Sequence, residues 1–572
     1  MNAHLRRTFY FFVAGFVSLV GVLAYWQVYV QESLANDPSN SLQSQRVQSV
    51  PRGLILAGDG ETELARSEEQ DSGTYERVYP EGPLYAGITG YWSTRYGASG
   101  IEIGENNNLS GNGEPETLDE LLNQISGGPQ AGNDVELTLD PELQRAAYDG
   151  LAASSTGRGA AVALDPKNGE VLALVSYPSY DPNNIDENFS DLIENPDNPR
   201  YNRATQGLYP PGSTFKVITA AAALESGVSP SDKLNDDGIY ETPGYDVYNY
   251  KARSYGEVTF EEAIAKSINT IFARVAYEYV GNQTLSETAY DFGFGDAYED
   301  FPLPVAPSSL GSTAPDDWVQ GDIAQISFGQ GPVTSNVFEM AQVTGAIANG
   351  GTLMNPRLVR EVRSPDGVIL DQPSSSVREN VLGEETANTL SDMMESVVED
   401  AETTAKIPGI KVAAKTGTAE NSTGDPHSWF ISFAPADDPE IAVAVIVENG
   451  NEGYKQALPI ARRMMETYLR SKGELPDESA TSGSASGGGS TTPQPQGGTT
   501  VPASQPAPQQ PQNVNPSQPF RAPSQSPGRA PTQPPNQAAP GQQPQSPGQA
   551  PGQQPQTPGQ PPGQPPVQRP GG

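Results

Sequence analysis

The N-terminal part of the chain carries one long apolar stretch. Residues 8–30 read TFYFFVAGFVSLVGVLAYWQVYV, with Gln27 as the only strongly polar side chain. A helix rises about 1.5 Å per residue, so this stretch can cross a hydrocarbon core of roughly 30 Å with some tilt. Arg6 and Arg7 precede it, and the positive-inside rule therefore leaves residues 1–7 in the cytoplasm. The pattern predicts a single-pass anchor in the cytoplasmic membrane, with the rest of the chain on the extracellular side.

A cleaved signal peptide is the alternative interpretation of this stretch. The apolar run is long for a signal peptide, and no A-x-A cleavage site follows it. We therefore expect the mature protein to keep the stretch as its anchor.

Two further segments are polar and rich in turn-forming residues. Residues 476–572 consist mainly of Pro, Gln, Gly and Ser, with almost no large apolar side chain. Such a segment cannot bury enough surface to offset the entropy that folding removes, so we expect a disordered tail. Residues 36–133 are polar and Gly-rich but contain short apolar runs, which predicts a small non-catalytic N-terminal domain.

Between these segments, residues 134–472 have the pattern of an α+β domain. Residue 134 starts a short alternating strand, and Asp140 before a proline marks the start of a helix. Apolar runs predict strands at 159–165, 170–176, 411–420, 429–434 and 440–447. Apolar spacing predicts helices at 213–224, 260–280, 337–349 and 457–470. Two strands, a helical insert, three strands and a final helix indicate a sheet covered by helices.

Composition excludes several kinds of chemistry. The chain has no Cys and two His, so disulfides, thiolate metal sites, Cys nucleophiles and multi-His metal sites are all excluded. A Ser-His-Asp triad could use only His427, which we interpret as a structural residue between strands. The formal net charge is −37, and so acidic a chain repels nucleic acid.

The first candidate motif is S-T-F-K, from Ser213 to Lys216, at the start of a predicted helix. Residues three apart on a helix share a face, so the two side chains can meet. A serine hydroxyl becomes a good nucleophile when a base removes its proton, and a lysine can be that base if burial and nearby cations lower its pKa. The helix start also offers free N–H groups, which suit an oxyanion.

Two more motifs contain groups that complement the first. The segment S-I-N holds Ser267, which could relay a proton, and Asn269, which could orient an amide substrate. The segment K-T-G-T lies in the strand predicted at 411–420. Lys415 is a cation suited to a carboxylate or to lowering the pKa of Lys216, and Gly417 could let a substrate backbone lie along the strand.

Each motif alone is weak, because S-x-x-K is expected by chance about once or twice in a chain of this length. All three in this order, placed on a helix start, a helix and a strand, are far less expected. The combination resembles the serine penicillin-recognising enzymes, which comprise penicillin-binding proteins and class A β-lactamases. The compact N-terminal part and the run LANDPSN after the anchor look most like the actinobacterial penicillin-binding protein A group. The stretches around the motifs resemble a class B penicillin-binding protein over about residues 45–470. These stretches are Arg52-Gly53, 138–144, 159–183, Asn202-Arg203, 209–216, 329–351 and 427–435.

The resemblance implies a penicillin-recognising transpeptidase fold, with an antiparallel five-stranded sheet, covering helices and a helical insert. It implies D,D-transpeptidation, in which Ser213 attacks a D-Ala-D-Ala stem peptide with Lys216 as the base, and for which no metal or organic cofactor is needed. Ser267 and Asn269 would relay protons and orient the donor. The substrate-binding residues would be Lys415, Thr416, Gly417 and Thr418, and the backbone N–H groups of Ser213 and Thr418 would form the oxyanion hole.

The implied partners are peptidoglycan stem peptides, β-lactams and the cytoplasmic membrane, with a SEDS-family glycosyltransferase and other cell-wall synthesis proteins as further candidates. Two alternatives use the same motifs: a D,D-carboxypeptidase or β-lactamase-like hydrolase, and a non-catalytic β-lactam sensor. No E-x-x-L-N segment lies between Ser267 and Lys415, which favours a transpeptidase over a class A β-lactamase. A sensor needs a cytoplasmic output, for which residues 1–7 are too few.

Overall fold

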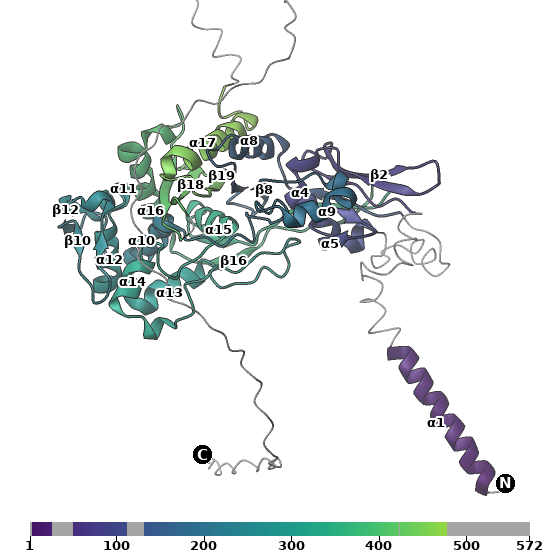
Figure 1. The fold of residues 1–572 in the computed structure, drawn as a ribbon. Helices are drawn as coiled ribbons and strands as arrows, with labels where there is room; N and C mark the ends of the chain where they lie inside the picture. Colours follow the sequence, from purple (N-terminus) through teal and green to yellow (C-terminus); the bar gives the residue numbers. More distant parts are fainter. Residues whose placement is uncertain (1–2, 26–49, 111–130, 423, 477–572) are drawn as a thin grey trace, which may run out of the picture. The chain divides into compact units, whose positions relative to one another are not determined.

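The computed structural model describes residues 3–25, 50–110, 131–422 and 424–476 (Figure 1). Helix α1 (Ala3–Tyr25) covers most of the predicted anchor, and residues 26–30 of that anchor lie outside the described part. No helix in the described ranges combines the length and the apolar character that crossing a bilayer requires. The predicted tail, apart from its first residue, also lies outside the described residues, so its disorder stays a prediction.

The central sheet has five antiparallel strands in the order β17-β18-β19-β7-β8. All five strands predicted from apolar runs are present, within three residues of the predicted ends. Their bounds are β7 (Gly159–Leu164), β8 (Val171–Tyr177), β17 (Ala413–Ala419), β18 (His427–Ala434) and β19 (Ile441–Val447). Strand β17, which carries the K-T-G-T motif, is an edge strand, so one of its backbone edges is not paired within the sheet.

Helices bury both faces of this sheet, which explains why its strands are continuous apolar runs. Along β19, Ala442, Ala444 and Ile446 belong to one hydrophobic cluster, whereas the alternate residues belong to a second. Helix α15 (Val337–Ala348) contributes to the first cluster, while α8 (Pro141–Ala152) and α17 (Gly453–Ser471) contribute to the second. Asp140 caps α8 as predicted, because its side chain accepts the Leu143 N–H.

The insert between β8 and β17 is mainly helical. Besides α15, its helices are α9 (Ile185–Glu194), α10 (Lys216–Glu225), α11 (Phe260–Ala265), α12 (Asn269–Val275), α13 (Gly281–Asp291), α14 (Gln320–Ile326) and α16 (Glu384–Ser396). Short strand pairs join β9 (Lys233–Asp236) to β12 (Gly256–Thr259), β10 (Ile239–Tyr240) to β11 (Val247–Tyr248) and β13 (Thr352–Met354) to β16 (Val377–Asn380).

The single helix predicted at 260–280 is wrong. The chain forms α11, turns, and then forms α12, which continues as a π-helix over Ala276–Val280. The turn contains Ser267 with a φ of +56°, a left-handed conformation that ends α11. The S-I-N motif therefore lies at a corner between two helices. The predicted helix at 213–224 also differs in its first turn, which is a 3₁₀ helix over Gly212–Phe215.

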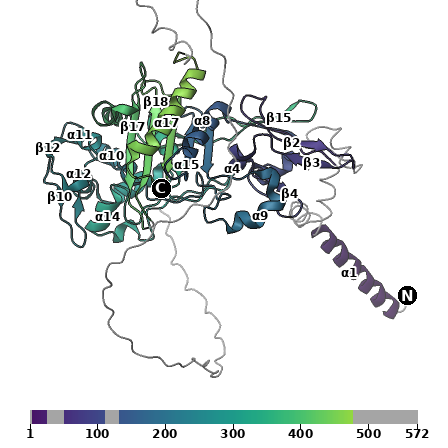
Figure 2. The same cartoon turned by 45° about the horizontal axis from the view of Figure 1, so that its top comes forward.

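A second, six-stranded sheet forms the core of the N-terminal domain, in the order β15-β14-β6-β1-β2-β3. Strands β15, β2 and β3 of this sheet are labelled in Figure 2. The bounds are β1 (Ile55–Leu56), β2 (Glu63–Glu69), β3 (Tyr75–Val78), β6 (Asp134–Leu137), β14 (Val359–Arg363) and β15 (Ile369–Asp371). Strand pairing thus crosses the predicted boundary at residue 134, because β14 and β15 come from far along the chain. Shorter elements complete this domain: α4 (Ala86–Thr89), β4 (Trp92–Ser93), β5 (Gly97–Ala98), α5 (Ile101–Gly104) and α6 (Asn106–Leu109).

One carboxylate is fully buried in the N-terminal domain. Glu102 accepts hydrogen bonds from the Nε of Arg77 at 2.6 Å, the Nε of Arg52 at 3.0 Å and the Tyr79 hydroxyl at 3.1 Å. Burial alone would raise the pKa of Glu102, but the charges of Arg77 and Arg52 outweigh it and hold that pKa below its usual value. Glu102 is therefore a paired, ionised group inside this domain.

Candidate active site

Two glycines let the helix start that carries Ser213 approach strand β17 closely. Gly212 has a φ of +55°, and a Cβ there would lie 2.9 Å from the carbonyl oxygen of Thr418. A Cβ on Gly417 would lie 2.9 Å from Cγ2 of Thr214 and 2.8 Å from Cβ of Trp429. Protein atoms therefore occupy the space beside Gly417, and the helix start packs directly on the K-T-G-T strand.

Lys216 is fully buried and points at the S-I-N corner. Its Nζ donates to the Ser267 carbonyl oxygen at 2.8 Å, to Oδ1 of Asn269 at 2.7 Å and to Oγ of Ser267 at 3.2 Å. Burial, and then the charge of Lys415, lowers the pKa of Lys216 well below its usual value. Deprotonation of Lys216 is therefore much easier than that of a solvated lysine.

Lys415, in the K-T-G-T motif, contacts the same Ser267 hydroxyl. Its Nζ donates to Oγ of Ser267 at 3.0 Å and to the Thr416 carbonyl oxygen at 3.1 Å. Burial lowers the pKa of Lys415 to about 8, and the charge of Glu402 opposes this shift. The hydroxyl of Ser267 thus lies between two buried amines, which makes it a path for a proton between them.

The donor count indicates how Lys216 can act as a base. An ammonium has three N–H donors and no lone pair. The Lys216 ammonium has three acceptors here, so it can donate hydrogen bonds but cannot take a proton. When neutral, the amine keeps two donors and gains a lone pair that can take a hydroxyl proton. Among the described residues, the Ser213 hydroxyl makes no hydrogen bond, so its proton is not committed to another protein group. Catalytic hydrogen bonds often tighten only when substrate binds.

A buried carboxylate that the sequence did not reveal supports Asn269. Asp236 accepts hydrogen bonds from Oγ1 of Thr270 at 2.5 Å and from Nδ2 of Asn249 at 2.8 Å. Oδ1 of Asn249 in turn accepts the Thr270 N–H at 3.1 Å, and the Tyr248 carbonyl accepts Nδ2 of Asn269 at 3.1 Å. These contacts fix the start of α12 and orient the Asn269 side chain, with Oδ1 toward Lys216.

The remaining residues of the predicted site lie on strand β17. Thr416 is half-buried, Gly417 is buried and Thr418 is exposed. Because Gly212 lies against the carbonyl of Thr418, the backbone segments of Ser213 and Thr418 are neighbours. This is the arrangement that an oxyanion hole made from their N–H groups requires. In the described part of the chain, no group of three or more His, Asp or Glu residues is placed to hold a metal ion.

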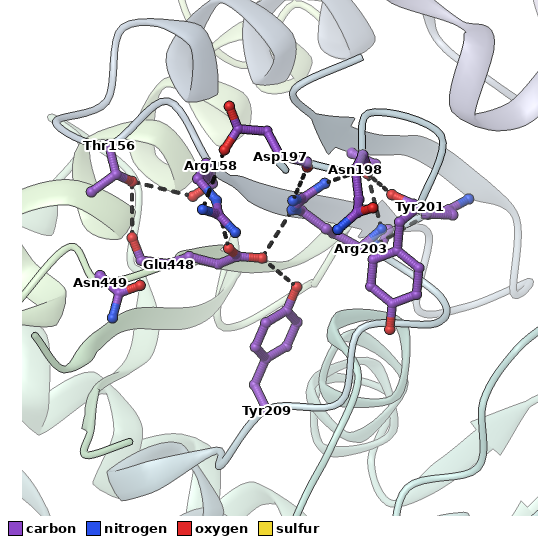
Figure 3. A network of polar contacts seen from close by, with 12 residues as sticks. Thr156, Arg158, Asp197, Asn198, Tyr201, Arg203, Tyr209, Glu448 and Asn449 are labelled. Atoms are coloured by element: carbon purple, nitrogen blue, oxygen red, sulfur yellow. Dashed lines mark hydrogen bonds and ion pairs between the residues drawn. The ribbon is translucent and has the colours of Figure 1, made fainter. Parts of the chain in front are cut away.

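All three motifs converge, since Lys216 contacts Ser267 and Asn269 of the second motif and Lys415 contacts Ser267. Their catalytic roles stay predictions. His427 stands outside the site, at the start of β18, where its Nδ1 accepts the Asn449 N–H at 3.1 Å. Arg203 and Tyr209 lie in stretches that carried the family resemblance, but sequence gave them no role; the structure joins both to Glu448 (Figure 3).

Comparison with known families gives two matches. Residues 159–466 match the family described as the penicillin binding protein transpeptidase domain. Residues 52–135 match the penicillin binding protein A dimerisation domain. The two matches correspond closely to the five-stranded sheet with its helices and to the N-terminal domain.

Similar proteins and structures agree with these matches. A Mycolicibacterium smegmatis protein named peptidoglycan D,D-transpeptidase PbpA is 35% identical over 495 residues, covering 82% of this chain and 99% of that protein. The Escherichia coli K12 protein named peptidoglycan D,D-transpeptidase MrdA is 34% identical over 362 residues, covering 57% of this chain and 56% of that protein. The imipenem acyl-enzyme structure of penicillin-binding protein A from Mycobacterium tuberculosis has a TM-score of 0.70 and 35% identity, covering 74% of this chain and 99% of that chain. The chain therefore belongs to the penicillin-binding protein family, in the penicillin-binding protein A group, as its motifs indicated.

Proposed function

We propose that the chain is a peptidoglycan D,D-transpeptidase that cross-links stem peptides through an acyl-enzyme on Ser213. The observation that carries this proposal is the convergence of two buried lysines, Lys216 and Lys415, on the hydroxyl of Ser267. Of the two, Lys216 lies one helical turn after Ser213. A lysine whose pKa is lowered by burial can serve as a general base at neutral pH. The relatives named as peptidoglycan D,D-transpeptidases support the same reaction.

In the acylation step, neutral Lys216 takes the hydroxyl proton while Oγ of Ser213 bonds to the penultimate carbonyl carbon of a D-Ala-D-Ala peptide. The carbonyl oxygen becomes an oxyanion, held by the N–H groups of Ser213 and Thr418. The C–N bond then breaks. Ser267 gives its proton to the departing amine of D-alanine, and the Lys216 ammonium returns a proton to Ser267. The products are an ester on Ser213 and free D-alanine.

In the transfer step, the amine of a second stem peptide attacks this ester. Lys216 takes the proton that the amine loses and then passes it to Oγ of Ser213 as the ester C–O bond breaks. The products are the cross-linking amide and the free serine. Buried Lys415 supplies the positive charge that attracts the substrate carboxylate. A β-lactam enters by the same route, but its opened ring stays attached, so the acyl-enzyme persists.

The transfer experiment uses the full chain with a mixture of donor and acceptor stem peptides. We expect a cross-linked dimer and one released D-alanine per cross-link, and we expect neither from Ser213→Ala. Release of D-alanine without dimer would contradict transfer and favour the carboxypeptidase or hydrolase alternative. Mass spectrometry of the products distinguishes these outcomes.

Our proposal also places the protein in the cytoplasmic membrane as a single-pass protein, with its catalytic domain on the extracellular side. Helix α1 supports this placement with a set of exposed apolar side chains, which are costly in water. The set is Tyr10, Phe11, Phe12, Val13, Phe16, Val17, Leu19, Val20, Val22 and Tyr25. In that location a SEDS-family glycosyltransferase and other cell-wall synthesis proteins would be suitable partners.

The anchor and its orientation are tested separately from the chemistry. We expect the mature N-terminus of protein from the membrane fraction to precede residue 8, and we expect protease added to intact protoplasts to digest the catalytic domain. A mature N-terminus beyond residue 30 would contradict the anchor. A catalytic domain protected until lysis would contradict the orientation. Co-purification of a SEDS-family protein from mild detergent tests the partner, and its absence under cross-linking conditions would argue against one.

A further inference from the structure

A polar network joins the loop before Ser213 to the end of strand β19 (Figure 3). At its centre, the carboxylate of Glu448 accepts hydrogen bonds from the Tyr209 hydroxyl at 2.8 Å, the Nε of Arg203 at 2.9 Å and the Nε of Arg158 at 3.0 Å. Arg203 is only 2% exposed, whereas the side chain of Arg158 is 41% exposed. A buried guanidinium needs such a partner, because desolvating an unpaired charge is costly.

The same network holds Glu448 and the loop from several directions. Nη2 of Arg203 donates to the carbonyl oxygen of Asp197 at 2.6 Å, and Nη1 donates to that of Asn198 at 3.3 Å. Oγ1 of Thr156 donates to the Glu448 carbonyl at 2.8 Å, and the Glu448 N–H donates to the Arg158 carbonyl at 2.8 Å. Both the backbone and the side chain of Glu448 are therefore fixed.

Tyr209 begins the run that leads to the nucleophile. The Tyr209 N–H and carbonyl pair with Ser335 at 2.9 and 2.8 Å, and the next carbonyl, that of Pro210, accepts the indole N–H of Trp429 at 3.0 Å. The Gly212 N–H donates to the Gly329 carbonyl at 2.9 Å. Within residues 209–213, Tyr209 makes a hydrogen bond from its side chain to another side chain, that of Glu448. Two prolines stiffen the connection, so a displacement at Tyr209 is transmitted to Ser213.

We propose that Glu448 is a positioning residue for the nucleophile. Through the Tyr209 hydroxyl, it fixes residues 209–213 so that Oγ of Ser213 meets the acyl carbonyl at the reactive distance and angle. This inference rests on the proposed acylation of Ser213, and no proton or bond of that step passes through Glu448. Positioning matters because a misplacement of about 1 Å caused far from the reacting atoms can cost about a hundredfold in rate.

The first test is Tyr209→Phe in the full chain. The ring can keep its edge-on contacts with His427 and Trp429, at centroid distances of 5.4 and 6.2 Å, and only the hydroxyl is lost. We expect the acylation rate constant at saturating penicillin to fall about tenfold, as a displacement smaller than 1 Å implies. We expect the dissociation constant of the non-covalent penicillin complex to change by less than about twofold, because binding groups such as Lys415 are untouched.

Tyr201→Phe is the matched control. Its hydroxyl comes from the same loop but donates to the Gln206 carbonyl at 2.6 Å and does not reach Glu448. We expect the wild-type acylation rate constant. A wild-type rate constant in Tyr209→Phe would overturn the proposal. An equal loss in both variants would also overturn it, since general packing of the loop would then set the rate.

A second variant tests the path from Glu448. Glu448→Gln keeps the shape of the side chain but turns one acceptor oxygen into a donor that faces Arg203, Tyr209 or Arg158. We expect a larger fall in the acylation rate constant than in Tyr209→Phe, and little further loss in the double variant, because both changes break one chain of contacts. If the fold-losses of the two single variants multiplied in the double variant, the two side chains would act independently, which would contradict that chain of contacts. If wild-type protein is not acylated at Ser213, the proposed function itself fails; if it is acylated and the variants match it, only the positioning role fails.

Discussion

Two buried clusters, one around Glu102 in the N-terminal domain and one around the lysines of the candidate site, hold charge in opposite ways. In the N-terminal domain, Glu102 is surrounded by Arg52, Arg77 and the Tyr79 hydroxyl, so every charge has an opposite partner in hydrogen-bond contact. In the candidate site, Lys216 and Lys415 are fully buried, yet their hydrogen-bond acceptors are hydroxyl, carbonyl and amide oxygens. Paired charges keep their ionised form, whereas cations without a contacting carboxylate become easy to deprotonate. The first arrangement stabilises a fold, and the second prepares a base.

Lys216→Arg gives the largest expected effect, because a guanidinium stays protonated and cannot act as a base. We expect the rate of penicillin acylation at Ser213 to fall by about 10²–10⁴-fold, the usual contribution of general base catalysis. The measurement is stopped-flow or quenched acylation with labelled penicillin, with circular dichroism to verify folding. Substantial acylation by folded Lys216→Arg protein would remove Lys216 from the role of base.

Glu102→Gln tests the other side of the comparison. Removing the negative charge leaves two buried guanidinium groups without their counter-ion, and breaking such a pair typically costs about 3–5 kcal/mol. We expect a clearly lower melting temperature with an unchanged acylation rate constant for the folded protein. Calorimetry and the acylation assay measure the two quantities. A loss of acylation at full stability would show that Glu102 serves the candidate site.

The pH dependence of acylation should reflect the two lysines. Burial and the charge of Lys415 lower the pKa of Lys216, so the rate should rise with pH as Lys216 becomes neutral, by at most about tenfold per pH unit. Above a pH of about 8, Lys415 in turn loses its charge, and binding of the penicillin carboxylate should weaken. Because the two lysines interact, the apparent pKa values taken from the rising and falling parts of the pH profile describe the pair of lysines and not either one alone. Penicillin binding that does not weaken above a pH of about 8 would contradict the assignment of Lys415. A rate that does not fall as the pH is lowered until Lys216 is protonated would contradict the assignment of Lys216.

Acid stability gives the smallest expected effect. The folded pKa of Glu102 lies below its unfolded value of 4.5, so its contribution is fully present above that pH and is lost as the pH falls through the folded pKa. We expect the melting temperature to decline over this acidic range, by an amount equivalent to about 1.4 kcal/mol for each unit by which the pKa is lowered. In Glu102→Gln this part of the decline should be absent. An identical decline in both proteins would assign it to other groups.

The pattern of apolar and polar residues was sufficient to predict the helices and strands that depend mainly on their own residues. The five strands are apolar runs because both faces of the sheet are buried, and the N-cap at Asp140 follows from its side chain and the proline after it. The turn at Ser267 was missed because nothing in its neighbours forbids a helix. Its left-handed backbone lies where Lys216 and Lys415, distant in sequence, converge on Ser267.

The candidate site likewise contains residues that the sequence predicted and residues that only the structure revealed. Its three motifs are short spacings that a sequence displays directly, and the structure brings them together. Asp236 and Glu448 have no such spacing, since each acts on residues that only the fold brings near. The N-terminal sheet likewise takes β14 and β15 from beyond α15, a pairing that depends on tertiary structure. Arg203 and Tyr209 carried the family resemblance, but their shared partner became visible only in three dimensions.

The site of penicillin attachment tests the central claim most directly. The full-length protein is incubated with labelled penicillin, digested with trypsin and analysed by mass spectrometry. Our account predicts one stable adduct, on Ser213, because this hydroxyl lies one turn from a buried lysine with a lowered pKa and beside the K-T-G-T strand. An adduct on another residue, or none on folded protein, would contradict it.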